Sequence, residues 1–403
     1  MTSLIKRIPR MSRIASNRVV YLSLLVAVSL FAFTSGERLI YIASLVLVIM
    51  PVVSYIITFI MVLALNIRQT LPTTIVKEQT GKLLVRLHNK FPLPFANVEC
   101  RFFYNEYAIE IDTDYGLYIG PMEAVTYEVP FYAIYRGTYQ FGLSEIVATD
   151  LMGLFRLSHK LKQTETLLVL PRIIELKSIP FKIDIVAEAS SRFDHRDEDY
   201  SVISDIRPYI PTDSIKRVHW KLTAKRNEWL VKVFQSNALN CVTILLDSQA
   251  AQVSEEERYY LEDQITENAL AFARYCLKKS MAVEFVDTEG NKTRSPSLNN
   301  FNIIYNSTAT LEFKDNPPLS PASILTNMLN DSTSYVNSIV FTTRLDVDLY
   351  ERIVNALNKG HFTAVVYFAT DTPYREYERI YKLMQDNGLP CLRISEEVSL
   401  DVA

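Results

Sequence analysis

The chain has 403 residues, and its 42 basic and 45 acidic side chains leave a formal net charge of −3. With 49% hydrophobic residues it can bury substantial cores, which excludes global disorder, and its length suits two or three domains of roughly 150 residues each. The few glycines form neither a GxGxxG motif nor a complete Walker A loop, and cysteines 100, 241, 276 and 391 are too widely spaced for a CxxC metal knuckle. No cofactor is therefore expected.

Two long apolar runs near the N-terminus predict a pair of transmembrane helices within a membrane anchor at residues 1–66. Residues 19–36 carry no charge and would span about 27 Å as a helix, and residues 39–65 would span about 40 Å. The second run exceeds a hydrocarbon core of roughly 30 Å, so it should tilt or kink, most simply at Pro51. Neither run shows the polar stripe of a soluble helix.

The charges that flank these two apolar runs predict how the pair of helices is oriented in the membrane. Basic residues precede the first run (Lys6, Arg7, Arg10, Arg13, Arg18) and follow the second (Arg68, Lys77, Lys82, Arg86), whereas only Arg38 lies between them. The positive-inside rule then places both termini in the cytoplasm. A cleaved signal peptide is the alternative, although 34–36 is a poor cleavage site and the second run would still return the chain to the cytoplasm.

The charge is unevenly divided between the anchor and the remainder of the chain. Residues 1–66 have a net charge of +5, which leaves −8 for the rest. A basic anchor suits an anionic inner leaflet, and an acidic body argues against nucleic acid as a partner. The lipid bilayer is the first partner that the sequence indicates.

Residues 67–170 predict an all-β domain. Alternating runs at 82–89, 97–106, 124–134, 137–150 and 166–171 are separated by turn residues and show no helical periodicity. Strands of this length and spacing are typical of an immunoglobulin-like sandwich. An aromatic group is expected to fill the core and its flanks, the alternative being a ligand-binding face (Phe102, Phe103, Tyr104, Tyr107, Tyr115, Tyr118).

The segment 171–240 connects two domains and holds the most specific pattern in the chain. Asp213 can cap a helix on which Ile215, Val218 and Leu222 form an apolar stripe. We expect His219 to be a packed, hydrogen-bonded side chain, since it has no acidic partner at relay spacing. The chain's two tryptophans, Trp220 and Trp229, are expected to anchor the segment onto the adjoining domains.

A second stripe in this segment is cationic. Arg217, Lys221 and Lys225 are four residues apart, and like charges at this spacing on a helix repel by about 0.2–0.5 kcal/mol per pair. The acidic residues just upstream offer one compensation (Asp194, Asp197, Glu198, Asp199). A phosphate, an anionic lipid or an acidic partner surface offers another, and the sequence does not choose between them.

Residues 241–403 predict an α/β domain with a doubly wound parallel sheet. Strand patterns at 241–247, 281–287, 337–343, 361–370 and 390–395 alternate with helical patterns at 254–280, 321–331, 345–360 and 373–388. Ser254 and Glu257 form a capping box, and Gly360 and Gly388 suit left-handed helix C-caps.

Asp247, at the carboxyl end of the first of these strands, is where a ligand site is expected in such a sheet. A metal-dependent adhesion site would need DxSxS, but Gln249 and Ala251 replace both serines, and Arg344 after a later strand puts a cation nearby. Asp247 thus occupies a degenerate metal-site position. We expect a turn-capping Asp and no bound metal.

The connecting segment resembles the signature of a bacterial family, the domain of unknown function 58 proteins. Thr212 and Lys225 replace the family's glycine and final arginine, while the other signature positions match in register (Arg207, Tyr209, Asp213, Arg217, His219, Trp220, Lys221, Thr223, Ala224). The β region matches through Arg136-Gly137-x-Tyr139 and Asp150-x-x-Gly153-Leu154-Phe155. The resemblance implies a von Willebrand factor type A-like C-terminal domain and an association with MoxR-type AAA+ ATPases and with transglutaminase-like membrane proteins.

These features together predict a membrane-anchored, non-enzymatic interaction protein. The interaction residues are expected among the signature positions (Arg207, Tyr209, Asp213, Arg217, His219, Trp220, Lys221, Lys225). The alternative is a hydrolase or transferase that holds a phosphorylated substrate on Arg207–Lys225. Against an enzyme, GxSxG and HExxH motifs are absent, and the five histidines include no i, i+4 pair.

Overall fold

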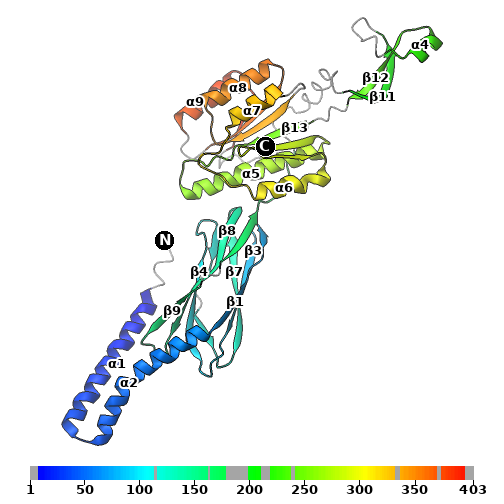
Figure 1. Cartoon of the computed structure of the whole chain (residues 1–403). Helices are drawn as coiled ribbons and strands as arrows, with labels where there is room; N and C mark the ends of the chain where they lie inside the picture. The colour runs from blue at the N-terminus through cyan, green and yellow to red at the C-terminus, as the bar shows by residue number, and fades with distance from the viewer. Residues whose placement is uncertain are drawn as a thin grey trace. The chain divides into compact units, whose positions relative to one another are not determined.

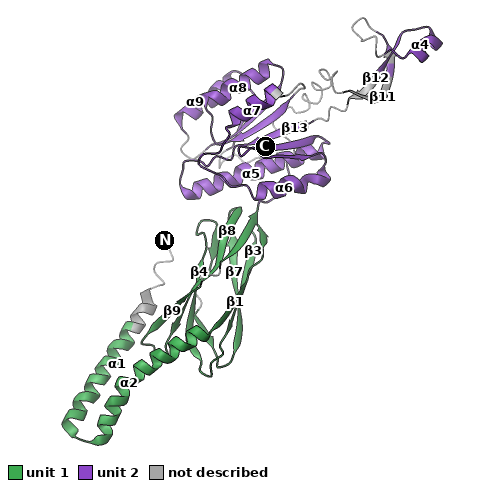
Figure 2. Cartoon of the chain, viewed as in Figure 1, with its two compact units in different colours: residues 1–170 green, residues 171–403 purple. Residues whose placement is uncertain are grey.

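A computed structural model describes residues 8–112, 116–161, 164–177, 198–209, 218–236, 241–331, 336–369 and 374–394, with backbone only at 8–14, 198–205, 207, 233–236 and 331. The chain divides into two compact units, residues 1–170 and residues 171–403 (Figure 2). The division falls where the sequence predicts the end of the β domain. Each unit is described by itself.

The first unit begins with two apolar helices, α1 (Ile8–Ser35) and α2 (Arg38–Ala64). Gly36 turns the chain between them with φ +64°, and a hydrogen bond of 3.0 Å joins Ser29 and Ser44 across the pair. In Figure 1 the helices lie side by side near this turn. Their windows Ala15–Ser35 and Arg38–Ala64, with mean hydropathies of 1.8 and 2.7, are long and apolar enough to cross a membrane, which confirms the predicted pair of helices.

Most large apolar side chains of α1 and α2 are not covered by protein. Phe33 is 84% exposed and Leu39 is 78% exposed, and most other large apolar side chains between Val19 and Val53 are 41–66% exposed. Beyond Pro51, however, α2 buries one face against the β region, through Ser54, Thr58, Met61 and Val62. The excess length that predicts a tilted or kinked span is thus partly explained by a helix end that packs on protein.

Two β-sheets follow α2 in the first unit. One sheet has the order β1 (Asn66–Thr70), β3 (Thr80–His88), β7 (Ala124–Ala133), β5 (Ile109–Ile111). The other has the order β2 (Thr74–Val76), β10 (Glu165–Leu170), β8 (Gly137–Thr149), β4 (Phe95–Phe103), β6 (Gly116–Ile119), with β9 (Arg156–Lys160) paired to β8. All described pairings are antiparallel except β10 with β2. The five predicted strands are confirmed as β3, β4, β7, β8 and β10.

Alternating side chains of the two sheets form the core of this unit. Along β3 every second residue is buried, including Leu83, Val85 and Leu87, because side chains in a strand point to opposite faces in turn. Phe131 of one sheet meets Phe141 of the other edge to face at 4.9 Å. Of the aromatic group predicted to fill the core and its flanks, three side chains are 44–60% exposed and lie outside the core (Phe103, Tyr107, Tyr118).

The second unit contains a small hairpin built from β11 (Glu198–Pro208), α4 (Trp220–Arg226) and β12 (Leu230–Ser236). Strands β11 and β12 pair antiparallel, with Arg207 opposite Val231. Val218 forms an isolated antiparallel bridge to the same Val231 just before α4 begins. Asn227 ends α4 in a left-handed conformation with φ 58°, which asparagine adopts more readily than most residues.

The largest sheet of the second unit has six strands. Their order is β15 (Lys292–Ser295), β14 (Ala282–Asp287), β13 (Cys241–Leu246), β16 (Asn337–Thr342), β17 (Phe362–Phe368), β18 (Cys391–Ile394). Five of these strands are the predicted ones and run parallel. The sheet has one further strand that the sequence does not predict, β15, which pairs antiparallel with β14 at one edge.

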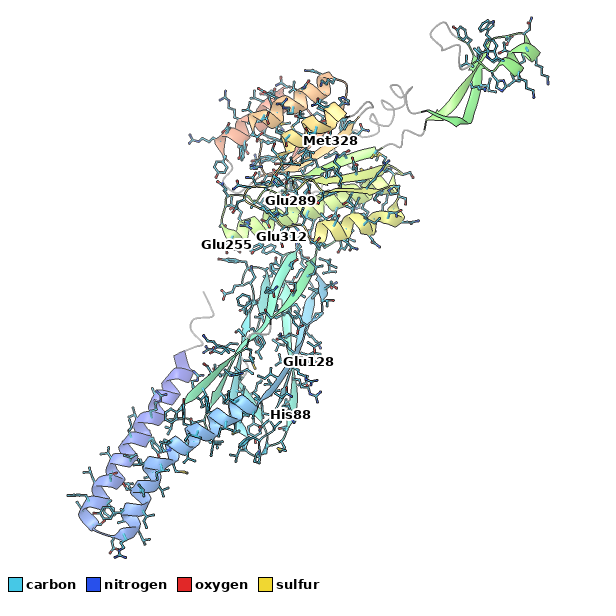
Figure 3. The ribbon with its side chains drawn as sticks, viewed as in Figure 1. His88, Glu128, Glu255, Glu289, Glu312 and Met328 are labelled. Carbon is cyan, nitrogen blue, oxygen red and sulfur yellow. The ribbon has the colours of Figure 1, made fainter. Side chains whose placement is uncertain are left out.

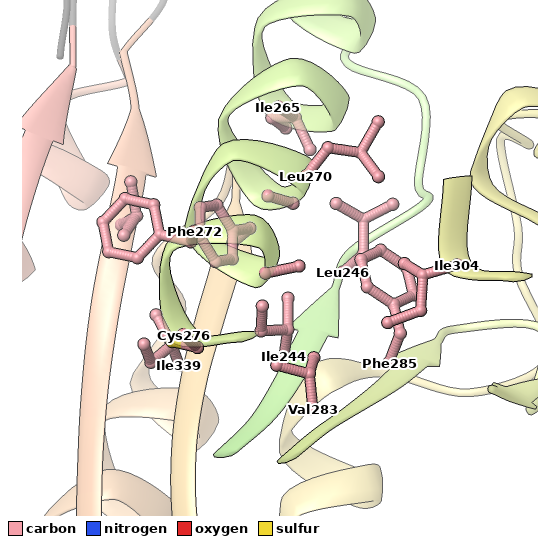
Figure 4. Close-up of a cluster of buried hydrophobic side chains, with 14 of the residues drawn as sticks. Ile244, Leu246, Ile265, Leu270, Phe272, Cys276, Val283, Phe285, Ile304 and Ile339 are labelled. Atoms are coloured by element: carbon pink, nitrogen blue, oxygen red, sulfur yellow. The ribbon is translucent and has the colours of Figure 1, made fainter. Parts of the chain in front are cut away.

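Helices cover both faces of this sheet. On one face α5 (Glu255–Lys278) and α6 (Phe301–Ala309) pack over side chains such as Ile244 and Val283, a cluster drawn in Figure 4. On the other face Leu245 and Val340 lie in a separate cluster under three helices, α7 (Pro321–Asp331), α8 (Val347–Asn358) and α9 (Arg375–Asp386). Successive residues of β13 therefore serve opposite cores, and the doubly wound arrangement is confirmed.

Helix ends in this domain follow the predicted local signals. The Ser254 hydroxyl accepts a hydrogen bond of 3.4 Å from the Glu257 amide at the start of α5. Gly360 and Gly388 have φ of +86° and +65° directly after α8 and α9. The antiparallel strand β15, the short η2 (Leu298–Asn300) and α6 occupy a stretch in which the sequence predicts no element.

Candidate functional site

The first candidate site lies at the carboxyl edge of the six-stranded sheet. The chain passes from β13 to β14 on one side and returns to β16 on the other, so the strand order reverses at β13. Crevices at such switch points are the common ligand sites of open α/β sheets. Asp247 directly follows β13, as predicted, and is 1% exposed.

Groups at the carboxyl ends of β13 and β16 surround the Asp247 carboxylate. It accepts a hydrogen bond of 2.7 Å from the Thr342 hydroxyl and lies 3.4 Å from Nη2 of Arg344. Its other oxygen accepts a bond of 3.2 Å from the Gln249 amide, which forms the predicted turn cap. The cation that the sequence puts near this position is thus paired with Asp247 itself.

Burial and charge act in opposite directions on this carboxyl group. Loss of solvent raises the pKa of Asp247, while the Arg344 guanidinium and the Thr342 hydroxyl lower it, and the pKa remains above its ordinary value. A lone carboxylate at this depth would be costly to keep ionised. Arg344 is therefore the main compensation for the buried charge.

The residues around Asp247 are engaged with one another and not arranged around an ion. Ser248 is completely buried and shares a hydrogen bond of 2.5 Å with the Thr288 hydroxyl. Among the residues that the structure describes, no group of three His, Cys, Asp or Glu side chains could hold a metal ion. The guanidinium of Arg344 takes up one side of the Asp247 carboxylate.

Two hollows flank the segment that follows Asp247. The larger, of about 590 Å³, is polar and is lined from the loop after β14 and the segment after α6, where Glu289 and Glu312 lie (Figure 3). A Lys314–Glu289 ion pair of 2.8 Å crosses part of it. The smaller, of about 200 Å³, contains Arg344, Tyr374 and Tyr377. Both could receive a polar group from a partner.

The second candidate site is the signature segment on the hairpin. The ring of Tyr209 lies 5.6 Å from that of Trp229, and the ring of Trp220 lies 6.0 Å from that of Trp229. Lys221 and Lys225 extend from exposed positions on α4. Asp213, Arg217 and the Arg207 side chain are outside the described residues, so the structure brings together five of the eight predicted residues, counting His219.

His219 has the hydrogen-bonded structural role that the sequence predicts. Its Nδ1 accepts a bond of 3.2 Å from the Leu222 amide, which caps the N-terminus of α4. Its own amide donates to the Leu230 carbonyl at 2.8 Å. The ring thus caps α4, and the backbone amide of the same residue joins the start of the helix to β12.

Two predictions for this segment are wrong. Val218 is paired with Val231 and α4 starts at Trp220, so Val218 and Leu222 do not lie on one helix as predicted, while Asp213 and Ile215 lie outside the described residues. The tryptophans do not anchor the segment by burial, since Trp220 is 58% exposed and Trp229 is 53% exposed. Sequence does not distinguish a tryptophan that packs inside from one that is presented at the surface.

The proposed internal compensation of the basic stripe falls partly outside the described residues. The side chains of Asp194, Asp197, Glu198 and Asp199 are not among them. Lys221 and Lys225 make no ion pair with any side chain in the part of the chain that the structure describes.

A third constellation, which sequence reasoning identified only as a motif, joins α1 and α2 to the β region. Asp150 is 1% exposed and accepts bonds of 2.7 Å from the Ser54 hydroxyl and from the amides of Leu154 and Phe155. Arg18 of α1 donates to the Leu154 carbonyl at 2.7 Å. The pair Ser54 and Thr58, one turn apart in an apolar helix, was the signal that could have indicated this contact.

No protein-family model and no curated protein matches the chain. Solved structures with local similarity include a cohesin module from a Clostridium perfringens family 33 glycoside hydrolase, with 11% identity over 26% of this chain and 96% of that one and a TM-score of 0.21. Trypsin-activated alpha-2-macroglobulin from Escherichia coli has 14% identity over 29% of this chain and 9% of that one, with a TM-score of 0.22. A FixG-related protein from Vibrio parahaemolyticus has 8% identity over 26% of this chain and 94% of its own, with a TM-score of 0.18. Scores this low support no conclusion about fold or function.

Proposed function

We propose that this chain is a membrane-anchored, non-enzymatic interaction protein of bacteria, related to the domain of unknown function 58 family. The observation that carries the proposal is the exposed apolar surface of α1 and α2, together with the attachment of these helices to the β region through Asp150. Such a surface is stable in lipid and costly in water. The positive-inside bias then puts both termini in the cytoplasm.

The finer fold assignment is part of this proposal. The two facing sheets of the first unit support an immunoglobulin-like sandwich. The strand order of the second unit, with one antiparallel edge strand and Asp247 at the switch point, supports a von Willebrand factor type A-like domain. Arg344 beside Asp247 supports a version of that domain that works without a metal ion.

The partner that we propose is a MoxR-type AAA+ ATPase, in an envelope-associated complex that can include a transglutaminase-like membrane protein. The family resemblance is the source of these partners. The two hollows support a contact with a protein surface that offers polar groups, because the larger is lined by the Lys314–Glu289 ion pair and the smaller by Arg344 and two tyrosines.

The test uses the full chain, tagged at its C-terminus, in cells of a bacterium that encodes it. Membranes are washed with alkaline carbonate, and cells are crosslinked before solubilisation and mass spectrometry. We expect the chain to stay with the washed membranes and to crosslink to the ATPase through residues 241–394. Release by carbonate would contradict the anchor, and turnover of a small molecule by the purified chain would contradict the non-enzymatic assignment.

A substitution in the small hollow makes the crosslinking test specific. Tyr374→Ala alters an exposed side chain of that hollow, and Tyr118→Ala alters a similarly exposed tyrosine of the first unit. We expect the first variant to lose ATPase crosslinks and the second to keep them. Equal crosslinking of both variants would remove the small hollow from the proposed interface.

A further inference from the structure

The hairpin presents aromatic and basic side chains on one small surface. We define the aromatic–basic surface as Tyr209, Trp220 and Trp229 with Lys221, Lys225 and Arg226. The three rings lie in sequence at 5.6 and 6.0 Å, and both tryptophans are more than half exposed. Burial of large aromatic rings is strongly favourable, so two neighbouring exposed tryptophans indicate a surface that something else covers.

The scaffold under this surface is held in place by specific contacts. Trp229 is fixed through its carbonyl, which accepts a bond of 2.8 Å from the Tyr209 amide. Val218, Leu230 and Val231 are buried beneath it, at 1–5% exposure. The β11–β12 hairpin therefore has a small core of its own, and its backbone hydrogen bonds hold the two tryptophan rings outside that core.

The charge of the surface specifies the chemistry of what covers it. Between residues 218 and 232 the cations are Lys221, Lys225, Arg226 and Lys232, against the single anion Glu228. None of these lysines or arginines makes an ion pair within the described residues. The covering partner is accordingly anionic.

We propose that the aromatic–basic surface binds the headgroup layer of an anionic phospholipid bilayer. Tryptophan and tyrosine favour the membrane–water interface because one end of each ring is apolar and the other is polar, and lysine and arginine are attracted to anionic headgroups. The same chain has two helices that can cross a membrane, so a bilayer is always at hand. The two tryptophan rings are exposed on the β11–β12 hairpin and can insert into a fluid headgroup layer, which needs no pocket of complementary shape.

This inference rests on the membrane anchoring in the proposed function and adds a second, weaker contact. A polybasic patch alone binds anionic lipid reversibly and depends on salt. Contact with the leaflet through the hairpin would hold the signature segment at the membrane surface. Release from the leaflet would leave the anchor in place.

The composition of the chain makes this proposal directly measurable. Trp220 and Trp229 are the only tryptophans among the 403 residues, so all tryptophan fluorescence of the native protein comes from this surface. The full chain is reconstituted in nanodiscs of phosphatidylcholine alone or with phosphatidylglycerol. We expect emission at shorter wavelength in the anionic discs, and quenching there by brominated phosphatidylglycerol.

Charge-reversal variants supply the controls. Lys221→Glu with Lys225→Glu should abolish the spectral shift, whereas Lys382→Glu on the exposed side of α9 should retain it. Ionic strength of 1 M, at which the Debye length is about 3 Å, should also reverse the shift. Since both lysines are exposed, circular dichroism should show an unchanged fold.

Equal, solvent-exposed emission in both kinds of disc would overturn the proposal and would assign the surface to an acidic protein instead. That outcome is distinct from failure of the proposed function, because incorporation of the chain into nanodiscs tests the anchor separately. Quenching by brominated phosphatidylcholine alone, unaffected by the double charge reversal, would also overturn it, since contact would then not depend on anionic lipid.

Discussion

At the scale of single residues, the decisive pair is Asp247 and Arg344. A buried ion pair often contributes little net stability, since both charges lose their hydration, but removal of one partner leaves the other uncompensated. Here the carboxylate is almost fully buried and the guanidinium side chain is 26% exposed. Removal of Arg344 should therefore destabilise the fold more than removal of the Asp247 charge, because Arg344 can still be solvated and Asp247 cannot.

We predict that Arg344→Met lowers the free energy of unfolding by roughly 2–3 kcal/mol at pH 8 and by less at pH 5. Burial already raises the pKa of Asp247, and loss of the Arg344 cation raises that pKa further. A carboxyl group with a raised folded-state pKa contributes stability that is fully present below its unfolded pKa, about 3.9, and is lost as the pH rises through its folded pKa. Thermal unfolding followed by circular dichroism across this pH range measures the difference.

The double variant Asp247→Asn, Arg344→Met is the control for this prediction. Without the titrating carboxyl group, the excess pH dependence of the single variant should disappear. Parallel pH curves for the Arg344→Met variant and the native protein would show that the carboxylate has another counter-charge.

A second residue-scale prediction concerns Asp150. Asp150→Ala should destabilise the first unit by roughly 3 kcal/mol, because the Leu154 and Phe155 amides and the Ser54 hydroxyl lose a charged acceptor in a buried place. Hydrogen-exchange mass spectrometry of peptides covering residues 150–160 and 54–64 should show faster exchange in both. Glu110→Ala, at an exposed position of β5, should change neither peptide.

At the scale of secondary-structure elements, α2 combines two environments along one helix. From Arg38 to Val53 its surface is almost entirely exposed and apolar. From Ser54 onward one face packs on the β region, while Phe59, Ile60 and Leu63 stay exposed on the other. The centre of the bilayer is therefore expected nearer Val46 than Pro51, with the last turns at the interface.

This placement gives a prediction about charges in α2. Val46→Arg should weaken membrane integration by about 2.5–3.5 kcal/mol, the cost of an arginine at the middle of a span. Leu63→Arg, about 25 Å further along the helix, should cost much less because its guanidinium can reach the headgroups. The integrated fraction after carbonate extraction measures both. Equal loss in the two variants would mean that the whole helix lies within hydrocarbon.

The alternation of strands and helices after residue 241 could be predicted because each element there has its own local pattern. Strand β13 is a short apolar run, and α5 begins with a serine cap and three glutamates. Strand β15 could not be predicted, because Lys292–Ser295 is polar and becomes a strand only by pairing with β14. Long-range pairing overrides local propensity in such short elements.

The same reason explains the errors in the signature segment. The start of α4 is set by the Val218–Val231 bridge and by the Leu230 carbonyl, neither of which is visible in a helical periodicity. Likewise Asp150 is 96 residues from Ser54, so the attachment of α2 appears in sequence only as two unremarkable polar residues. The signature positions can be selected from the sequence as a candidate group, but the burial of each side chain cannot.

At the scale of the whole molecule, the charge distribution and the number of spans constrain one another. Residues 1–66 have a net charge of +5 and the remainder has −8. Basic residues are concentrated before the first apolar run and after the second, on the two outer flanks of the helix pair. In the proposed two-span topology the chain returns to its starting side, so residue 403 and the N-terminus share a compartment whichever way the two helices insert. The flanking cations then favour the cytoplasm for both.

Reporter fusions test this arrangement. Green fluorescent protein fused after Ala403 should fluoresce, alkaline phosphatase fused there should be inactive, and a short tag inserted after Gly36 should be accessible from outside the cytoplasmic membrane. Reversal of the flanks by Lys6, Arg7, Arg10, Arg13 and Arg18→Glu, with Glu37→Lys, should lower the cytoplasmic fraction, because it removes the asymmetry that sets the orientation. An active alkaline phosphatase at residue 403 of the native chain would place the acidic body outside. The MoxR-type ATPase, which needs cytosolic ATP, would then be excluded as a direct partner. The lipid contact of the aromatic–basic surface would remain testable on the other leaflet.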